Sequence, residues 1–126
     1  EKYGIPFHLP SQFPRNGLRA ARVACVGQDE AWIAPFARAV MQANFGEDRD
    51  IGERAVIADI LTRLDLPADS LLDAADSEAA KIALRRQTEQ ATTRGLFGAP
   101  SFIVGDELFW GNDRLEDALA WATGRR

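Results

Sequence analysis

The feature that most constrains this chain is a pair of short β-type runs near its end, separated by two residues. Residues 102–104 precede Gly105-Asp106, and residues 107–110 follow it. A two-residue link that contains glycine is typical of a β-hairpin, since glycine adopts the positive φ that tight hairpin turns require. Pro100 belongs at a strand start or on an edge, because it cannot donate to a sheet ladder. The sequence therefore predicts a hairpin that leads into a helix near Asn112.

Upstream of the hairpin, apolar residues recur at intervals of three and four, which predicts five helices. Caps, glycines and prolines set their expected ends. The expected helices are residues 16–26, residues 29–46, residues 53–64, a short helix after Pro67, and a helix from Asp76 or Ser77 to Arg94. Because of Pro35, we expect the second of these to have a kink or to start later, near Ala34.

Three details of this region have a structural interpretation. Leu18, Ala21 and Cys25 are spaced to share one helix face, so Cys25 is expected to be a small buried hydrophobe rather than a reactive thiol. Residues 47–50 are expected to form a solvated loop, because their spacing does not fit a calcium site. The arginines at 125–126 are expected to be solvated.

Composition excludes several functional classes. The net charge of −4, with no basic cluster, argues against non-specific nucleic-acid binding. No apolar run is long enough to cross a bilayer. A single cysteine excludes an internal disulfide and fits a reducing compartment, so the cytoplasm is the expected location. His8 is the sole histidine, which excludes a Ser-His-Asp triad and a His-rich metal site within this chain. We expect it on the surface, with a place in the wall of a substrate site as the alternative.

Two ordered clusters near the C-terminus carry a family resemblance. They read Gly95-x-Phe97-Gly98-x-Pro100-x-Phe102 and Phe109-Trp110-Gly111-x-Asp113-Arg114-Leu115. Together with residues 3–7 and 13–18, they resemble the 2-hydroxychromene-2-carboxylate isomerases. That group is similar to the kappa-class glutathione transferases within the DsbA-like proteins.

The resemblance implies an α/β fold of the thioredoxin-like, DsbA type with a helical insertion. Residues 1–14 are then a connecting loop, residues 15–94 the helical insertion domain, and residues 95–126 the C-terminal half of the thioredoxin-like domain. A lone two-stranded hairpin is marginal in water, and no other strand is predicted in residues 1–94. We therefore expect this chain to be a C-terminal portion of the fold, with an N-terminal βαβ unit missing.

The resemblance also implies a glutathione site. Sequence alone favours a trans bond before Pro100, whereas the family implies a cis bond. A cis turn would leave the N–H and C=O of Ala99 facing outward, where they can bind the extended backbone of glutathione. Asn112 and Asp113 have two interpretations, as N-caps of the last helix or as ligands of the γ-glutamyl end. The expected glutathione-binding residues are Ala99, Pro100, Asn112 and Asp113.

For function, the resemblance implies a glutathione-dependent isomerase that acts on a chromene-type or other small aromatic acid, as a homodimer. The family's activating serine has no counterpart in this chain, so we expect the catalytic residue upstream and the fragment alone to be inactive. The aromatic residues of the two clusters are expected to lie mostly in the core, with one or two facing the substrate. Three alternatives stay open: a kappa-class glutathione transferase, a DsbA-like thiol-disulfide oxidoreductase, and a non-catalytic thioredoxin-like binding module.

Overall fold

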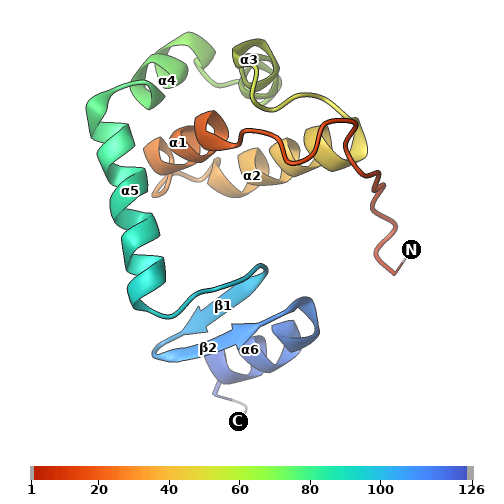
Figure 1. Ribbon diagram of the computed structural model, residues 1–126, viewed down its shortest axis with the longest axis vertical. Coiled ribbons are helices and arrows are strands. Elements are labelled where there is room, and N and C mark those ends of the chain that lie inside the picture. The colour runs from red at the N-terminus through yellow and green to blue at the C-terminus, as the bar shows by residue number, and fades with distance from the viewer. Residues whose placement is uncertain (1, 125–126) are drawn as a thin grey trace. The chain divides into compact units, whose positions relative to one another are not determined.

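The computed structural model describes residues 2–124, in two compact units (Figure 1). We call Glu1–Arg85 the helical unit and Arg86–Arg126 the hairpin unit. The two arginines at 125–126, expected to be solvated, lie outside the described residues. The helical unit contains α1 (Leu18–Val26), α2 (Ile33–Met41), the π-helical turn η1 (Gln42–Gly46), α3 (Arg54–Arg63), α4 (Ala68–Ala75) and the first part of α5 (Glu78–Thr93). The hairpin unit contains the rest of α5, β1 (Ser101–Val104), β2 (Glu107–Trp110), the 3₁₀ turn η2 (Asn112–Arg114) and α6 (Leu115–Ala122).

The core of the helical unit is formed by the apolar faces of α1 to α4, which lie together in Figure 1. Its most deeply buried large side chains are Val23, Phe36, Ile57, Leu61 and Leu72. Burying a side chain of this kind contributes about 1.5–3 kcal/mol relative to leaving it exposed. These contacts, rather than helix propensity, hold helices of eight to ten residues in place.

The predicted helices are present, with shifted ends. α2 begins at Ile33, so Pro35 lies in the first turn, where its missing N–H leaves no helical hydrogen bond unmade. The Ser77 hydroxyl accepts a hydrogen bond from the N–H of Ala80 at 3.2 Å, as expected of a residue that precedes α5. The π-helical turn after α2 was not predicted, since it has no simple sequence signal. Among residues 2–124, no helix combines the length and the apolar content needed to span a membrane.

The predicted face of α1 is wrong. Ala20 and Val23 point into the core, whereas Leu18 is 50% exposed. Leu18 is the first residue of α1, and helical side chains lean toward the N-terminus, so its side chain extends past the packed face. Cys25 is half-buried rather than buried, and desolvation raises the pKa of its thiol.

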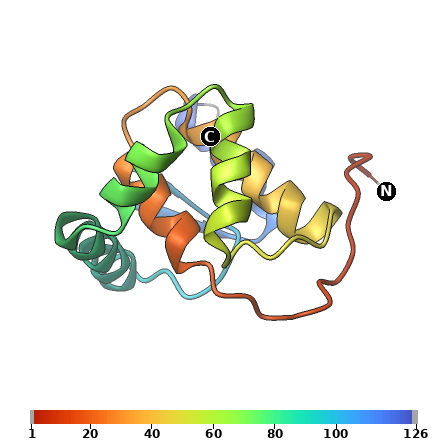
Figure 2. The same ribbon diagram turned by 90° about the horizontal axis from the view of Figure 1, so that it is seen from above.

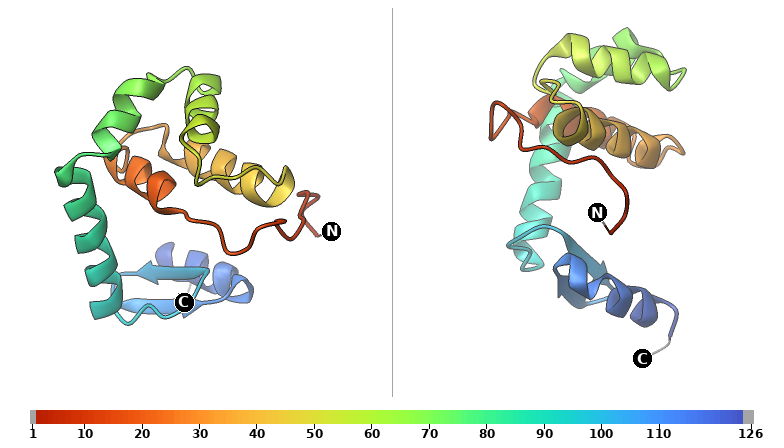
Figure 3. Two further views of the ribbon diagram at one scale, coloured as in Figure 1. Left: turned by 45° about the horizontal axis from the view of Figure 1, so that its top comes forward. Right: turned by 90° about the vertical axis from the view of Figure 1, so that its right-hand side faces the viewer.

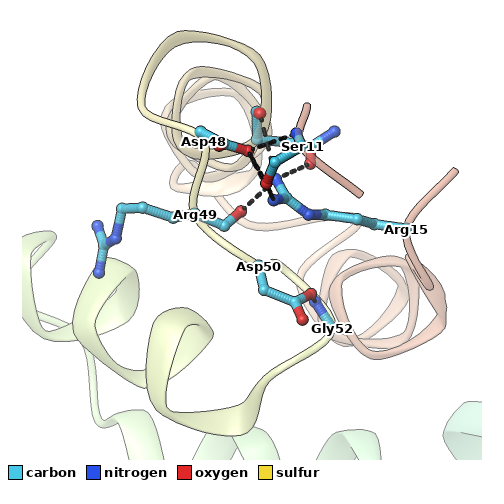
Figure 4. Close-up of polar contacts among 7 residues, drawn as sticks. Ser11, Arg15, Asp48, Arg49, Asp50 and Gly52 are labelled. Atoms are coloured by element: carbon cyan, nitrogen blue, oxygen red, sulfur yellow. Dashed lines mark hydrogen bonds and ion pairs between the residues drawn. The ribbon is translucent and has the colours of Figure 1, made fainter. Parts of the chain in front are cut away.

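Arg15 ties the N-terminal loop to the segment that follows η1 (Figure 4). Its side chain is only 4% exposed and pairs with the Asp48 carboxylate at 2.7 Å. The same guanidinium donates to the Asn44 side-chain oxygen at 3.1 Å and to the Arg49 carbonyl at 3.0 Å. Asp48 also accepts hydrogen bonds from the N–H and hydroxyl of Ser11. Figure 2 shows the loop running along the helical unit toward α1.

Residues 47–50 form a loop with Glu47 and Asp48 exposed, as predicted, but the loop also makes ion pairs that the sequence did not predict. Asp48 is bonded to the loop, and Arg49 pairs with Asp59 on α3 at 2.7 Å. Hydrogen bonds from the backbone N–H and the hydroxyl of Ser11, and from the Arg15 guanidinium, lower the pKa of Asp48. The sequence did not reveal these pairs because their members are far apart along the chain.

The hairpin unit confirms the predicted turn and strands. β1 and β2 pair antiparallel, and Gly105 has a φ of 61° in the two-residue turn. Phe109 is buried and meets Trp121 of α6 edge to face, with ring centroids 6.3 Å apart. Phe102 lies opposite Phe109 and shares this face. Figure 3 shows α6 lying across one face of the hairpin.

Candidate functional site

The start of β1 and the end of β2 are joined by a hydrogen bond beyond the last strand pair. The Gly111 N–H donates to the Pro100 carbonyl at 2.9 Å, next to the pair formed by Ser101 and Trp110. The peptide bond between Ala99 and Pro100 is cis. The ladder thus places Ala99 and Pro100 beside the residues that lead from β2 into η2 and α6.

Ala99 has a free backbone edge. Among the described residues, its N–H and C=O make no hydrogen bond, and the residue is exposed. Because Pro100, Phe102 and Val104 point their backbone groups toward β2, the alternate residues of β1 point theirs away from it. An exposed edge of this kind can pair with an extended peptide backbone.

Two aromatic side chains lie beside this edge. Phe97 and Trp110 are 71% and 54% exposed, and their ring centroids are 5.1 Å apart. Gly98 packs so tightly under the Trp110 indole that a Cβ there would overlap the ring nitrogen. Phe102 and Phe109 lie on the opposite, α6-covered side of the hairpin. The aromatic residues of the two clusters therefore divide into a packed pair and an exposed pair.

Asn112 and Asp113 are both exposed and belong to the 3₁₀ turn η2. The prediction that either one caps the last helix is wrong: the N-cap position of α6 is Arg114, and no side chain caps α6 or η2. The tighter 3₁₀ turn, closed by the Arg114 N–H to the Gly111 carbonyl at 3.1 Å, delays the start of α6. The Asp113 carboxylate is consequently not used as a helix cap.

Gly111 sets the position of that carboxylate. Its φ of 105° and ψ of 149° lie in a region that residues with a Cβ rarely adopt, and a Cβ there would overlap the Asp113 Oδ1 atom. Sequence reasoning did not identify Gly98 or Gly111 as site residues. Their position in the sequence next to Ala99 and Trp110 could have identified them, because a glycine in a strand often marks a place where another group packs closely against the backbone.

Fold and site together define a thioredoxin-like domain in which a proline-led hairpin enters the last helix. The model of the DSBA-like thioredoxin domain matches residues 1–120, so the chain belongs to this family. The predicted α/β, DsbA-type fold is confirmed as a mostly helical chain with a two-stranded antiparallel sheet.

Named relatives agree with this assignment. A 2-hydroxychromene-2-carboxylate isomerase of Sphingobium xenophagum is 33% identical over 115 residues, which cover 91% of this chain and 58% of the relative. A glutathione S-transferase kappa 2 of Caenorhabditis elegans is 28% identical over 90% of this chain and 56% of the relative. A solved structure of a 2-hydroxychromene-2-carboxylate isomerase is 31% identical, with a TM-score of 0.85 over 98% of this chain and 60% of that chain. The chain thus spans little more than half the length of these relatives.

Proposed function

We propose that the protein is a glutathione-dependent isomerase of the 2-hydroxychromene-2-carboxylate type. The observation that carries the proposal is the similarity to isomerases of that name, at 33% identity over 91% of this chain and at a TM-score of 0.85 to a solved structure.

The residues of the hairpin unit fit glutathione. The unpaired N–H and C=O of Ala99 suit the peptide backbone of glutathione, which would pair with them as a short strand. Beside Pro100, the exposed Asp113 carboxylate suits the ammonium group of the γ-glutamyl end. The backbone N–H groups at the start of η2, including that of Asn112, suit its carboxylate. Bound there, glutathione supplies a thiol nucleophile.

In this proposal, the described residues bind and orient rather than transform the substrate. Ala99 holds the backbone and Asp113 holds the ammonium group, so the orientation of the ligand is fixed at two points. We assign no catalytic residue to this chain, and we place the activating serine of the family in the part of the relatives' length that the chain does not span. We also propose a homodimer and a cytoplasmic location.

Glutathione affinity of the full-length protein tests the site. Replacing Asp113 by alanine should raise the dissociation constant about tenfold or more in calorimetric titration, since a hydrogen bond to a charged group is worth roughly 1.5–3 kcal/mol. Glu116→Ala is the matched control, because Glu116 carries the same charge in the first turn of α6, is exposed and forms no ion pair among the described residues. Equal affinities for all three proteins would defeat the site assignment.

Activity tests the reaction separately. The full-length protein should isomerise 2-hydroxychromene-2-carboxylate, followed by its absorbance change, and the rate should fall to background when glutathione is omitted. Turnover at an unchanged rate without glutathione would refute the proposed dependence on it.

A second candidate is a kappa-class glutathione transferase, which the similarity to the Caenorhabditis protein favours. Conjugation of glutathione to an electrophilic arene, without isomerisation of the chromene acid, would identify it. The family description keeps a DsbA-like thiol-disulfide oxidoreductase as an alternative, which disulfide reduction of insulin would reveal. A protein without any of these activities would be a binding module.

A further inference from the structure

A small pocket lies where the start of α1 meets the turn before α3 and the end of α4, all within the helical unit. It encloses about 110 Å³, roughly the volume of three to four water molecules in the liquid. A cavity of this size suits a small ion rather than a drug-sized molecule, which needs about 300 Å³ or more. The lining residues are Asn16, Leu18, Arg19, Arg22, Gly52 and Asp76.

The backbone around Gly52 closes one side of the pocket. The Arg19 guanidinium donates to the Gly52 carbonyl at 2.6 Å. The Gly52 N–H donates to the Asp50 carboxylate at 2.9 Å, and both residues are drawn in Figure 4. A Cβ at Gly52 would lie 3.2 Å from the Asn16 carbonyl oxygen, so this turn packs closely against the residues that lead into α1. The wall of the pocket is therefore formed by contacts within the helical unit.

Arg22 is the side chain in this wall that has no partner. It is half-buried, its Nε atom is wholly buried, and its guanidinium makes no hydrogen bond or ion pair among residues 2–124. The Nε atom of Arg15 also lacks an acceptor, but the other nitrogens of Arg15 are bonded. Taking a guanidinium out of water without an acceptor is unfavourable. Arg22 is therefore available to an anion that enters the pocket.

The positive charges of the wall exceed the negative ones. Arg19 and Arg22 are three positions apart on α1, so they share one helix face. Within the described part of the chain, neither forms an ion pair, since Arg19 donates to an uncharged carbonyl. Asp76 is the carboxylate among the lining residues, and it already pairs with Arg54 at 3.1 Å. The two arginines of α1 are thus not neutralised by the wall itself.

We propose that this pocket binds a small tetrahedral oxyanion, of which inorganic phosphate is the type. Its oxygens accept charge-assisted hydrogen bonds from Arg22 and from the N–H groups of Arg19 that do not bind Gly52. The side-chain amide of Asn16 offers a further donor, because its oxygen already accepts from the Leu18 N–H at 2.9 Å. This inference goes beyond the proposed function, since a pocket of this volume holds neither glutathione nor an aromatic acid.

Calorimetric titration of the full-length protein with inorganic phosphate tests the inference. One phosphate should bind per chain, and Arg22→Gln should weaken it about tenfold, because charge-assisted hydrogen bonds are lost. Arg38→Gln is the matched control: Arg38 is an exposed arginine on α2, lies outside the pocket, and its loss changes the net charge equally. The melting temperature without phosphate shows that each variant is folded.

A second variant should strengthen binding, so the test does not depend on the Arg22 variant alone. Asp76→Asn removes the carboxylate from the wall, and phosphate should then bind about threefold more tightly. Asp69→Asn is the matched control, because Asp69 is exposed in the first turn of α4 and does not line the pocket. It removes the same charge and should leave the phosphate affinity unchanged.

Two comparisons separate this pocket from the proposed glutathione site. Saturating glutathione should leave the phosphate affinity unchanged, because the pocket belongs to the helical unit and the proposed glutathione-binding residues belong to the hairpin unit. Phenyl phosphate should bind more weakly than phosphate, because its ring exceeds the volume of the pocket.

Any of five results would overturn the inference. Phosphate that fails to bind at millimolar concentration would mean that the pocket does not hold an anion. Equal weakening in the Arg22 and Arg38 variants would mean that overall charge attracts phosphate. Affinity that does not rise in the Asp76 variant would place the ion elsewhere. Competition by glutathione would place it in the hairpin unit, and phenyl phosphate that binds as tightly as phosphate would contradict the size of the site.

Discussion

Replacing Gly111 by alanine should destabilise the hairpin unit and displace the Asp113 carboxylate at the same time. The backbone of Gly111, with a φ of 105° and a ψ of 149°, lies in a region that costs other residues roughly 1–3 kcal/mol. The new Cβ would also overlap the Asp113 Oδ1 atom, so this side chain must leave its present rotamer. That movement adds on the order of 1 kcal/mol. The total loss of unfolding free energy should therefore be about 2–4 kcal/mol.

Urea denaturation measures this loss, with Gly105→Ala as the matched control. Gly105 also has a positive φ, of 61°, but a Cβ there would meet nothing within 4 Å. Its replacement should cost only the backbone term, about 1–2 kcal/mol. A double variant with Asp113→Ala removes the overlapping carboxylate. In that background, Gly111→Ala should cost about 1 kcal/mol less than in the unmodified protein.

The reasoning fails if Gly111→Ala is no more destabilising than Gly105→Ala. It also fails if the Gly111 and Asp113 substitutions are additive, since additivity would mean that the alanine Cβ and the Asp113 carboxylate do not meet. If the contact exists, Gly111→Ala should in addition weaken glutathione binding about as much as Asp113→Ala does.

Three further predictions follow from other contacts. Gly98→Ala should push the Trp110 indole into solvent, giving a red shift of tryptophan emission that disappears in a Trp110→Phe background. Arg15→Gln should lower the unfolding free energy by about 2–4 kcal/mol in urea titration. Arg15→Lys should be no more stable, because an ammonium group cannot make the several hydrogen bonds of the planar guanidinium. The pKa of Asp48 is lower in the folded protein than in the unfolded chain. The Asp48 carboxylate therefore stabilises the folded protein fully above the unfolded pKa of about 3.9, and this stabilisation is lost as the pH falls through the lower folded pKa. As the pH is lowered, the melting temperature of the Asp48→Asn variant should therefore fall less than that of the unmodified protein. An equal fall in the two proteins would contradict this prediction.

Local signals were sufficient to predict the hairpin and the helices. The glycine at position 105 needs no distant partner to specify a tight turn, and the structure has it at a φ of 61°. Gly95 likewise ends α5, with a φ of 82°, and its N–H donates to the Thr92 carbonyl at 3.0 Å. Information of this kind lies within a few residues along the chain, which is why sequence reasoning located these elements correctly.

Features that depend on distant contacts were not predictable in the same way. Arg15 pairs with Asp48, which is 33 positions away in the sequence. From the sequence alone, Glu47 and Asp50 were equally plausible partners. The core side of α1 depends on which other helices pack against Ala20 and Val23, and its apolar residues permit more than one stripe.

The geometry of the candidate site was not predictable from the sequence. Ala99, Pro100, Asn112 and Asp113 came from a family resemblance, and the structure holds all four in the hairpin unit. The 3₁₀ turn that excludes Asp113 from helix capping was not foreseen, because an acidic residue before a helix is typical of a cap. The binding role of the four residues stays a prediction.

The bond between the Pro100 carbonyl and the Gly111 N–H has an evolutionary consequence. Since each strand position alternates between two faces, one inserted residue would shift the pairing and turn Phe109 out of its contact with α6. The loop that would carry such an insertion is already the shortest that a hairpin commonly uses. Homologous chains that keep this contact with α6 should therefore vary in the residue types of the hairpin while its number of residues stays constant. A deletion or insertion there should mark chains in which the strand pairing has changed.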